Sequence, residues 1–218
     1  SKTFQIVVHI HVWNYSASGN TITATCSGDI GTCPDPEQSI TLTVPEDHTY
    51  TGDATYSASV EGSIDGVTCS VLYTGANTGY SSSEAPVNAD TYTVTLTAGG
   101  ESVSDTFTIS PKNIANCTAS LNEDQFAYSG KAPKLGVTVV DGSVGNSTLT
   151  KDTDYTVGDV QSNAGIYKLT VTGIGNYTGT LELDYTITAK EVSITGAVIQ
   201  PVTYDPNGYT LTVTGVTF

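Results

Sequence analysis

The chain repeats itself with a period of about 76 residues. The segment NADTYTVTLT at 88–97 returns as NAGIYKLTVT at 163–172, and Tyr50 returns as Tyr128 and Tyr204 at spacings of 78 and 76 residues. Such a period exceeds those of the common solenoid repeats. It therefore predicts an array of small β modules, each of which closes its own core.

The repeat also predicts the domain boundaries. Residues 1–38 form a β-hairpin leader unit, 39–110 and 111–189 form two full modules, and 190–218 begin a further, truncated module. The junctions near Pro111 and Ala189 contain no long Gly/Ser-rich or charged linker. Because short junctions restrict bending, the predicted shape is an extended rod.

Hydrophobic periodicity predicts that the modules are all-β. Tyr92, Val94 and Leu96 alternate with threonines, and the second module repeats this alternation over 167–172. A period of two residues is typical of antiparallel strands with one buried and one exposed face. Turn residues, among them 22 Gly and 8 Pro, separate the predicted strands. The residues expected to contribute to the core of the second module are Phe126, Tyr155, Tyr167, Leu169, Val171 and Tyr185.

The leader does not fit the repeat and is predicted to be a separate hairpin unit. The segments 13–15 and 21–26 are predicted strands, and residues 18–20 form the turn between them. The segment 4–11 is a further apolar strand. Because an apolar edge strand in water promotes aggregation, we expect residues 4–8 to pair with another strand.

Several motifs resemble repeats of large Gram-positive surface proteins. The second module contains FAYSGK at 126–131, VTVVDG at 137–142 and VTGIGNYTG at 171–179, and the resemblance covers 121–187. The first module is similar to the related MBG-type repeats, although Asp90 replaces a glycine of the pattern at a turn. The resemblance implies tandem immunoglobulin-like (Ig-like) sandwiches, with a mirrored β-grasp as the alternative fold.

The resemblance also implies a function and a location. Repeats of this kind are spacer and adhesion modules, so it implies a non-catalytic structural spacer or adhesion segment of a secreted or cell-surface bacterial protein. Its ligand would be an unknown host or cell-wall component, with glycans among the candidates. The export signal and the wall anchor are expected outside this chain. The alternative function is a carbohydrate-binding accessory module of a surface glycoside hydrolase.

The charge of the chain argues against two classes of partner. Its 22 acidic residues stand against 7 Lys and no Arg, which gives a net charge of −15 at pH 7. This charge repels nucleic acids and anionic lipids. The sequence also lacks the run of about 20 apolar residues that a membrane-spanning helix needs. We therefore expect neither nucleic-acid binding nor membrane insertion.

The sequence contains no motif that predicts catalysis or a cofactor. A Ser–His–Asp triad would have to use His9, His11 or His48, and no serine lies in a nucleophile-elbow motif. The Asp-x-Asp-x-Asp-Gly loop of an EF-hand calcium site is also absent from the sequence. We therefore expect no enzyme activity and no cofactor.

Aromatic residues are the candidates for glycan contact, because sugars stack on exposed aromatic rings. These candidates are Trp13, Tyr15, Tyr73 and Tyr80. An aromatic side chain on a short hairpin is more often part of a small core than a sugar platform. Exposure of the four rings would therefore decide between the two interpretations.

Lysine recurs at the start of two modules, as Lys112 and Lys190. Some surface adhesins lock their strands through a Lys–Asn amide bond, so both lysines are candidates for such an isopeptide bond. The simpler interpretation is that lysines at the starts of strands keep sheet edges soluble.

Two interpretations fit Cys26 and Cys33, which have six residues between them. A disulfide agrees with the predicted extracellular location, where thiols oxidise. A zinc site would add His9 and His11, which lie two apart on a predicted strand and so point the same way. We favour the disulfide, because the cysteines of structural zinc sites are usually separated by two to four residues. The cysteines expected to be buried and unpaired in different modules are Cys69 and Cys117.

Overall fold

The computed structural model describes residues 11–27, 33, 35–53, 56–191 and 206. The predicted strand at 4–11 lies outside the described residues except for His11. The predicted truncated module at 190–218 also lies outside them, apart from residues 190, 191 and 206.

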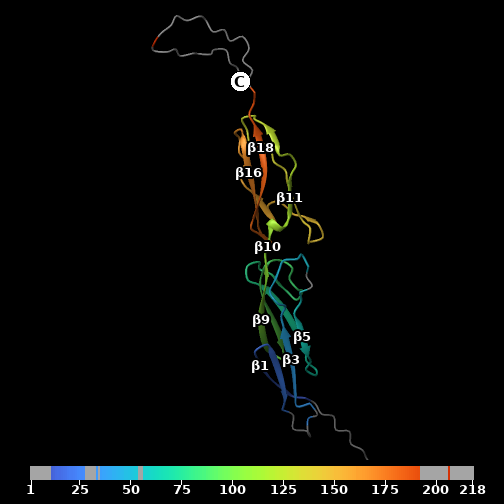
Figure 1. Ribbon diagram of the computed structural model, residues 1–218. Helices are drawn as coiled ribbons and strands as arrows, with labels where there is room; N and C mark the ends of the chain where they lie inside the picture. The colour runs from blue at the N-terminus through green and yellow to red at the C-terminus, as the bar shows by residue number, and fades with distance from the viewer. Residues whose placement is uncertain (1–10, 28–32, 34, 54–55, 192–205, 207–218) are drawn as a thin grey trace, which may run out of the picture.

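The described part of the chain is an all-β, extended rod of two modules placed end to end (Figure 1). The first module lies in the lower half of the view with β1, β3, β5 and β9, and the second lies above it with β10, β11, β16 and β18. Each module is a β-sandwich-type fold whose sheets consist mainly of antiparallel strands. The fold class predicted from the repeat is therefore confirmed.

The first module consists of two sheets. The first sheet has the order β1 (Trp13–Ser18), β2 (Thr21–Cys26), β3 (Glu37–Thr43) and β5 (Ser59–Gly62). The second sheet has the order β4 (His48–Thr49), β9 (Glu101–Ser110), β8 (Asp90–Ala98), β6 (Cys69–Gly75) and β7 (Ser81–Ser82). Both sheets contribute buried residues to one core, for example Ile22 and Leu42 from the first and Val94 and Phe107 from the second.

The second module contains a similar pair of sheets. One sheet has the order β11 (Thr118–Leu121), β13 (Val137–Asp141) and β14 (Ser147–Thr148). The other has the order β12 (Gln125–Ala127), β18 (Thr180–Thr188), β16 (Gly165–Gly173) and β15 (Tyr155–Val157). A short parallel pair, β10 (Lys112–Asn113) and β17 (Tyr177–Thr178), lies at the boundary with the first module.

The sequence repeat corresponds to a structural repeat. In each module a short early strand pairs in parallel with the last long strand, with His48 opposite Ile109 and Phe126 opposite Ile187. The repeated Asn-x-x-x-Tyr motif also makes the same hydrogen bond twice. The Tyr92 hydroxyl donates to the Asn88 carbonyl at 2.8 Å, and the Tyr167 hydroxyl donates to the Asn163 carbonyl at 3.1 Å.

The leader hairpin is part of the first module, so its prediction as a separate unit is wrong. Strand β2 pairs with β3 along its length, with Ile22 opposite Ile40. The side chains of Ile22 and Ala24 are fully buried in the core of the module. A two-stranded hairpin alone buries little apolar surface. By pairing with β3 it joins a four-stranded sheet, whose inner face is covered by the core of the module.

Alternation along the strands separates buried from exposed side chains as expected. Along β8, Tyr92, Val94 and Leu96 are buried between less buried threonines. The predicted core residues Tyr155, Leu169, Val171 and Tyr185 of the second module are buried, and Phe126 and Tyr167 are half-buried against them. The predicted burial of the other two cysteines is wrong, because Cys69 is exposed and Cys117 is only half-buried.

We expect the free energy of unfolding of the second module to fall by about 2–5 kcal/mol in Leu169→Ala, because the substitution leaves a cavity in its core. Ile166→Ala is the control on the same strand, since Leu169 is 1% exposed and Ile166 is 81% exposed. The free energy of unfolding of both variants is measured by urea denaturation, with hydrogen exchange in peptides from β16 and β18 as the readout. Equal losses in the two variants would contradict the described register of β16.

Candidate functional site

The junction between the modules is centred on Tyr50, which follows β4. Its ring packs against the core of the first module and also against the core of the second. It meets the Tyr177 ring edge to face, with the ring centroids 5.7 Å apart. Nearby, Gly52 has a φ of +75°, and a Cβ atom there would clash with Val144 of the second module. The two modules therefore share apolar packing at this point.

Asn176 ties the turn before β17 to the first module through both ends of its side-chain amide. Its Oδ1 accepts from the Ala89 N–H at 2.7 Å, and its Nδ2 donates to Asn88 Oδ1 at 2.9 Å. Its backbone carbonyl also accepts from the Lys112 N–H at 2.9 Å. One residue of the second module therefore holds two separate segments of the chain in place.

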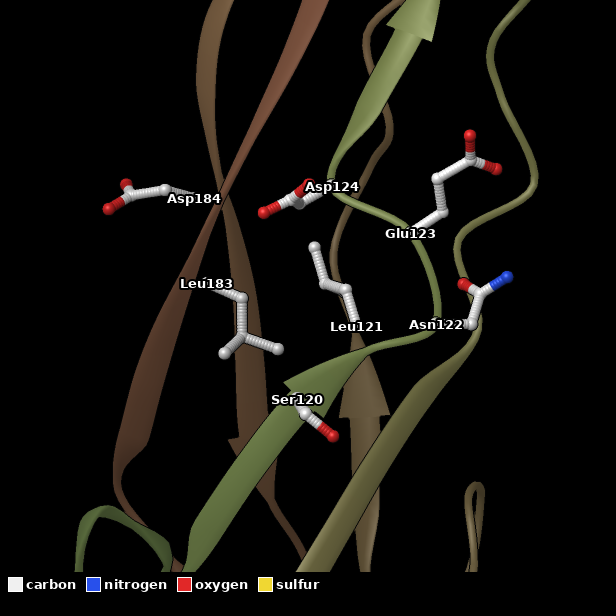
Figure 2. A pocket seen from close by; sticks show the side chains of 7 residues that line it. All are labelled: Ser120, Leu121, Asn122, Glu123, Asp124, Leu183 and Asp184. Atoms are coloured by element: carbon white, nitrogen blue, oxygen red, sulfur yellow. The ribbon is translucent and has the colours of Figure 1, made fainter.

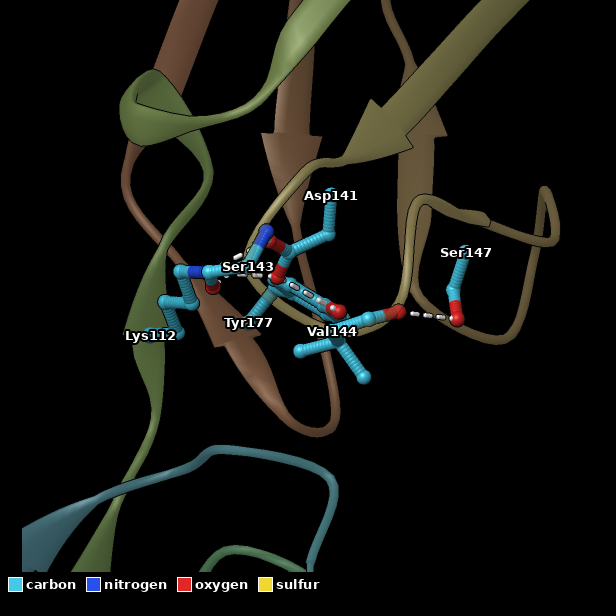
Figure 3. Close-up of polar contacts among 6 residues, drawn as sticks. All are labelled: Lys112, Asp141, Ser143, Val144, Ser147 and Tyr177. Carbon is cyan, nitrogen blue, oxygen red and sulfur yellow. Dashed lines mark hydrogen bonds and ion pairs between the residues drawn. The ribbon is translucent and has the colours of Figure 1, made fainter.

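A buried ion pair lies beside this junction (Figure 3). Lys112 Nζ lies 2.5 Å from Oδ1 and 2.7 Å from Oδ2 of Asp141, and it also contacts the Ser143 hydroxyl. Asp141 is fully buried and accepts further hydrogen bonds from the Ser143 N–H at 3.0 Å and from the Tyr177 hydroxyl at 3.2 Å. These contacts join β10, the end of β13 and β17.

Burial and neighbouring charges shift the pKa values of the Asp141 carboxyl and the Tyr177 hydroxyl in this cluster. Burial by itself raises the pKa of the Asp141 carboxyl, but the ion pair with Lys112 and the hydrogen bonds from Ser143 lower it below its ordinary value. Burial and the negative charge of Asp141 raise the pKa of the Tyr177 hydroxyl well above its ordinary value. At neutral pH, Asp141 is therefore ionised and Tyr177 keeps the proton that it donates.

The geometry around Lys112, one of the two candidate isopeptide lysines, differs from the predicted one. Lys112 Nζ contacts the carboxylate of Asp141, whereas the predicted amide bond requires an asparagine. The other candidate, Lys190, is exposed at the end of the second module.

A second cluster brings together three of the four predicted zinc ligands, His11, Cys26 and Cys33. Cys33 Sγ lies 3.6 Å from His11 Nδ1, and one ligand atom from each of the three residues lies within 4.8 Å of the others. Both cysteines are thiols in the structure, which does not contain the predicted Cys26–Cys33 disulfide. The fourth predicted ligand, His9, lies outside the described residues.

The β1–β2 hairpin positions this cluster. Cys26 lies directly opposite Trp13 in the ladder, and His11 stacks on the Trp13 ring with 4.3 Å between the ring centroids. The Cys26 N–H donates to the Pro36 carbonyl at 2.8 Å, so the chain returns beside Cys26 after Cys33. The ladder therefore positions Cys26 directly and His11 through its stacking on Trp13, and the return of the chain brings in Cys33.

The four candidate glycan-binding aromatic residues do not form a common exposed platform. Tyr73 is 3% exposed, and its hydroxyl accepts from the Ala58 N–H, so it is a core residue. Trp13, Tyr15 and Tyr80 are half-buried and pack against the same core. Trp13 also donates from Nε1 to the Asp65 carbonyl at 3.1 Å. The rings therefore contribute to the stability of the first module.

The described residues of each module also line a surface depression. One, of about 460 Å³, is lined by residues that include Tyr73 and Glu84. The other, of about 410 Å³, is acidic, and Figure 2 shows Glu123 turned away from Asp124 and Asp184. Asp184 also forms an ion pair with Lys168 at 3.1 Å. The lining carboxylates therefore do not converge on one point.

Sequence reasoning missed the buried acids. Asp90 was expected only to alter a turn, yet it is 8% exposed and accepts hydrogen bonds from the backbone and side chains of Asn77 and Thr78. Burial by itself raises the pKa of Asp90, and these hydrogen bonds lower it far below its ordinary value. A signal was present, because an aspartate replaces the small glycine of the next repeat, Gly165.

Comparisons with known proteins identify no relative. The chain matches no family model, no curated protein and no solved structure. Within the part of the chain that the structure describes, no helix is long and apolar enough to cross a membrane.

We expect Lys112→Met to lower the free energy of unfolding of the second module by about 3–5 kcal/mol, because it leaves the Asp141 carboxylate buried without its counter-charge. The double variant Lys112→Met/Asp141→Leu removes both charges and should recover much of this loss. Lys168→Met is the control, since Lys168 pairs only with exposed acids and should give no measurable change. Equal losses in Lys112→Met and Lys168→Met, measured by urea denaturation, would contradict the role of the pair.

The pKa of Asp141 is lower in the folded state than its ordinary value of 3.8. Its contribution to stability is therefore present above about pH 4 and is lost as the pH falls below that value. We expect Asp141→Asn to reduce the acid sensitivity of the second module, and Asp90→Asn to reduce that of the first. Hydrogen exchange of peptides from each module between pH 5 and pH 2, corrected for intrinsic exchange rates, measures this. Unchanged acid sensitivity in both variants would refute the prediction.

Proposed function

We propose that the chain is a non-catalytic structural spacer or adhesion segment of a secreted or cell-surface bacterial multidomain protein. The observation that carries this proposal is the junction, where Tyr50 packs against the cores of both modules. A spacer that keeps its neighbouring domains at a fixed distance needs joints that resist bending. Apolar packing shared by two modules supplies that resistance. The resemblance of the motifs to Gram-positive surface repeats supports the location.

The contacts at the junction restrain more than one direction of movement. The Tyr50–Tyr177 contact lies on one segment, and the hydrogen bonds of Asn176 reach a different one, around Asn88. Lys112 follows the connecting Pro111 directly and is fixed by its ion pair with Asp141. Bending at Pro111 would therefore disturb the contacts of Tyr50 and Asn176 between the modules, which favours a stiff joint over the mobile linkers common between domains.

The alternative function, a carbohydrate-binding accessory module of a surface glycoside hydrolase, has less support. Carbohydrate-binding surfaces present exposed aromatic rings, whereas the candidate rings of this chain pack against the first core. The spacer proposal requires no ligand and uses the contacts that join the modules.

We expect both modules of the wild-type chain to share one alignment tensor in NMR residual dipolar couplings, because a stiff joint makes them tumble together. Tyr50→Ala/Asn176→Ala should separate the two tensors, while core residues away from the two substituted positions keep their chemical shifts. The matched control is Tyr128→Ala, since Tyr128 is the repeat equivalent of Tyr50 at the far end of the second module. Different tensors in the wild type would contradict the stiff-spacer proposal.

We expect a glycoside hydrolase panel to detect no turnover by the wild-type chain. Robust turnover of any substrate would refute the non-catalytic proposal. A glycan array run in parallel separates the alternatives, because specific binding that is lost in Trp13→Ala would favour the carbohydrate-binding function instead.

A further inference from the structure

We propose that His11, Cys26 and Cys33 form a zinc-binding site at the end of the rod opposite the second module. Figure 1 places the start of β1 at that end. The proposal does not depend on the spacer function, because the site lies in the first module alone. It rests on the convergence of two sulfur atoms and one imidazole nitrogen from separate segments of the chain.

The distances between the ligand atoms fit a tetrahedral zinc ion. Zn–S and Zn–N bonds of about 2.3 and 2.05 Å at tetrahedral angles place sulfur and nitrogen about 3.6 Å apart and two sulfurs about 3.8 Å apart. The observed distance between Cys33 Sγ and His11 Nδ1 is 3.6 Å, and the three ligand atoms lie within 4.8 Å of one another. Binding would therefore need movements of about 1 Å or less at the cysteines.

The hairpin holds two of the ligands before a metal arrives. Cys26 belongs to β2, where its N–H is bonded to the Pro36 carbonyl. The imidazole of His11 lies nearly parallel to the Trp13 ring, at 11° between the planes, and Trp13 is itself anchored by the Asp65 carbonyl. Ligands oriented in advance by packing and hydrogen bonds lose less entropy when a metal binds.

The long sequence spacing of the cysteines does not weigh against the site. Six residues separate Cys26 and Cys33, which is more than the usual spacing of structural zinc pairs. That usual spacing brings two sulfurs together within one short turn. Here the bond between Cys26 and Pro36 closes the loop instead, and Cys33 also contacts the Asp35 carbonyl through its sulfur at 3.3 Å.

The donor set selects the type of metal. Thiolates and imidazole favour zinc, whereas calcium and magnesium take oxygen ligands. Two thiolates would balance the charge of Zn²⁺, and three protein ligands leave a fourth position for water or another donor. Oxidation of the same cysteines to a disulfide removes two electrons and two protons and also removes both sulfur ligands. Zinc binding therefore requires the reduced chain.

The test is a zinc titration of the complete, metal-free chain in competition with a chromophoric chelator. Full reduction is verified first by counting all 4 thiols after denaturation of an aliquot. We expect one zinc ion per chain, and cobalt in its place should give a thiolate-to-cobalt charge-transfer band. Cys26→Ser, Cys33→Ser and His11→Gln should each weaken zinc binding by more than about 100-fold, since even loss of an outer-shell partner costs 10–100-fold.

Matched controls lie elsewhere in the same chain. Cys69→Ser, Cys117→Ser and His48→Gln remove the same types of side chain outside the cluster and should bind zinc like the wild type. Failure of the reduced wild-type chain to bind zinc would overturn the proposal without reference to any variant. Wild-type affinity in Cys26→Ser and Cys33→Ser, with native circular dichroism, would overturn it as well.

Discussion

The small size of each module is the constraint on which the rest of the structure depends. A β module of fewer than about 80 residues buries a smaller fraction of its surface than a larger domain does. The first module enlarges its core by pairing the hairpin β1–β2 with β3, which brings in Ile22 and Ala24. Both modules also bury the ring of Tyr50 between them. The apolar contact at the joint therefore also adds to the buried surface of both modules.

Each of the two modules contains a buried aspartate whose carboxylate is fully hydrogen-bonded. The chain carries a net charge of −15, yet the side chains of Asp90 and Asp141 are both buried. Each holds a loop in place, Asp90 through hydrogen bonds from Asn77 and Thr78 and Asp141 through the ion pair with Lys112. Because every oxygen has partners, the cost of desolvating the carboxylates is offset, and the loops keep one conformation.

The sequence predicted where the strands lie better than it predicted which strands pair with one another in the sheets. Alternation identified the buried faces of β8 and β16 because a period of two residues is a local signal. Alternation did not reveal that β2 pairs with β3, because a strand has the same alternating pattern whichever strand it pairs with. It also placed Cys69 in the core, whereas Cys69 faces solvent from β6. The face on which a strand residue lies changes with a register shift of one residue.

The same distinction holds for the sites. The grouping of His11 with Cys26 and Cys33 followed from sequence, because it depends on a short hairpin and a short loop. The partner of Lys112 did not follow, because Asp141 is 29 residues away and the contact depends on how β10 and β13 are placed in the folded module. For the four candidate aromatic residues, residue type alone left a core role and a sugar platform both open, and it is their burial in the folded module that favours the core role.

The contact between the two modules is directional, because it joins two different surfaces. Tyr50 and Gly52 use one end of the first module to meet a different surface of the second, so the contact is head to tail. The second module repeats the first of these surfaces at its own far end, where Tyr128 is 40% exposed and Gly130 also has a positive φ. A head-to-tail contact does not close on itself as a two-fold contact does. Modules joined in this way would add in a line, so each further module would lengthen the rod.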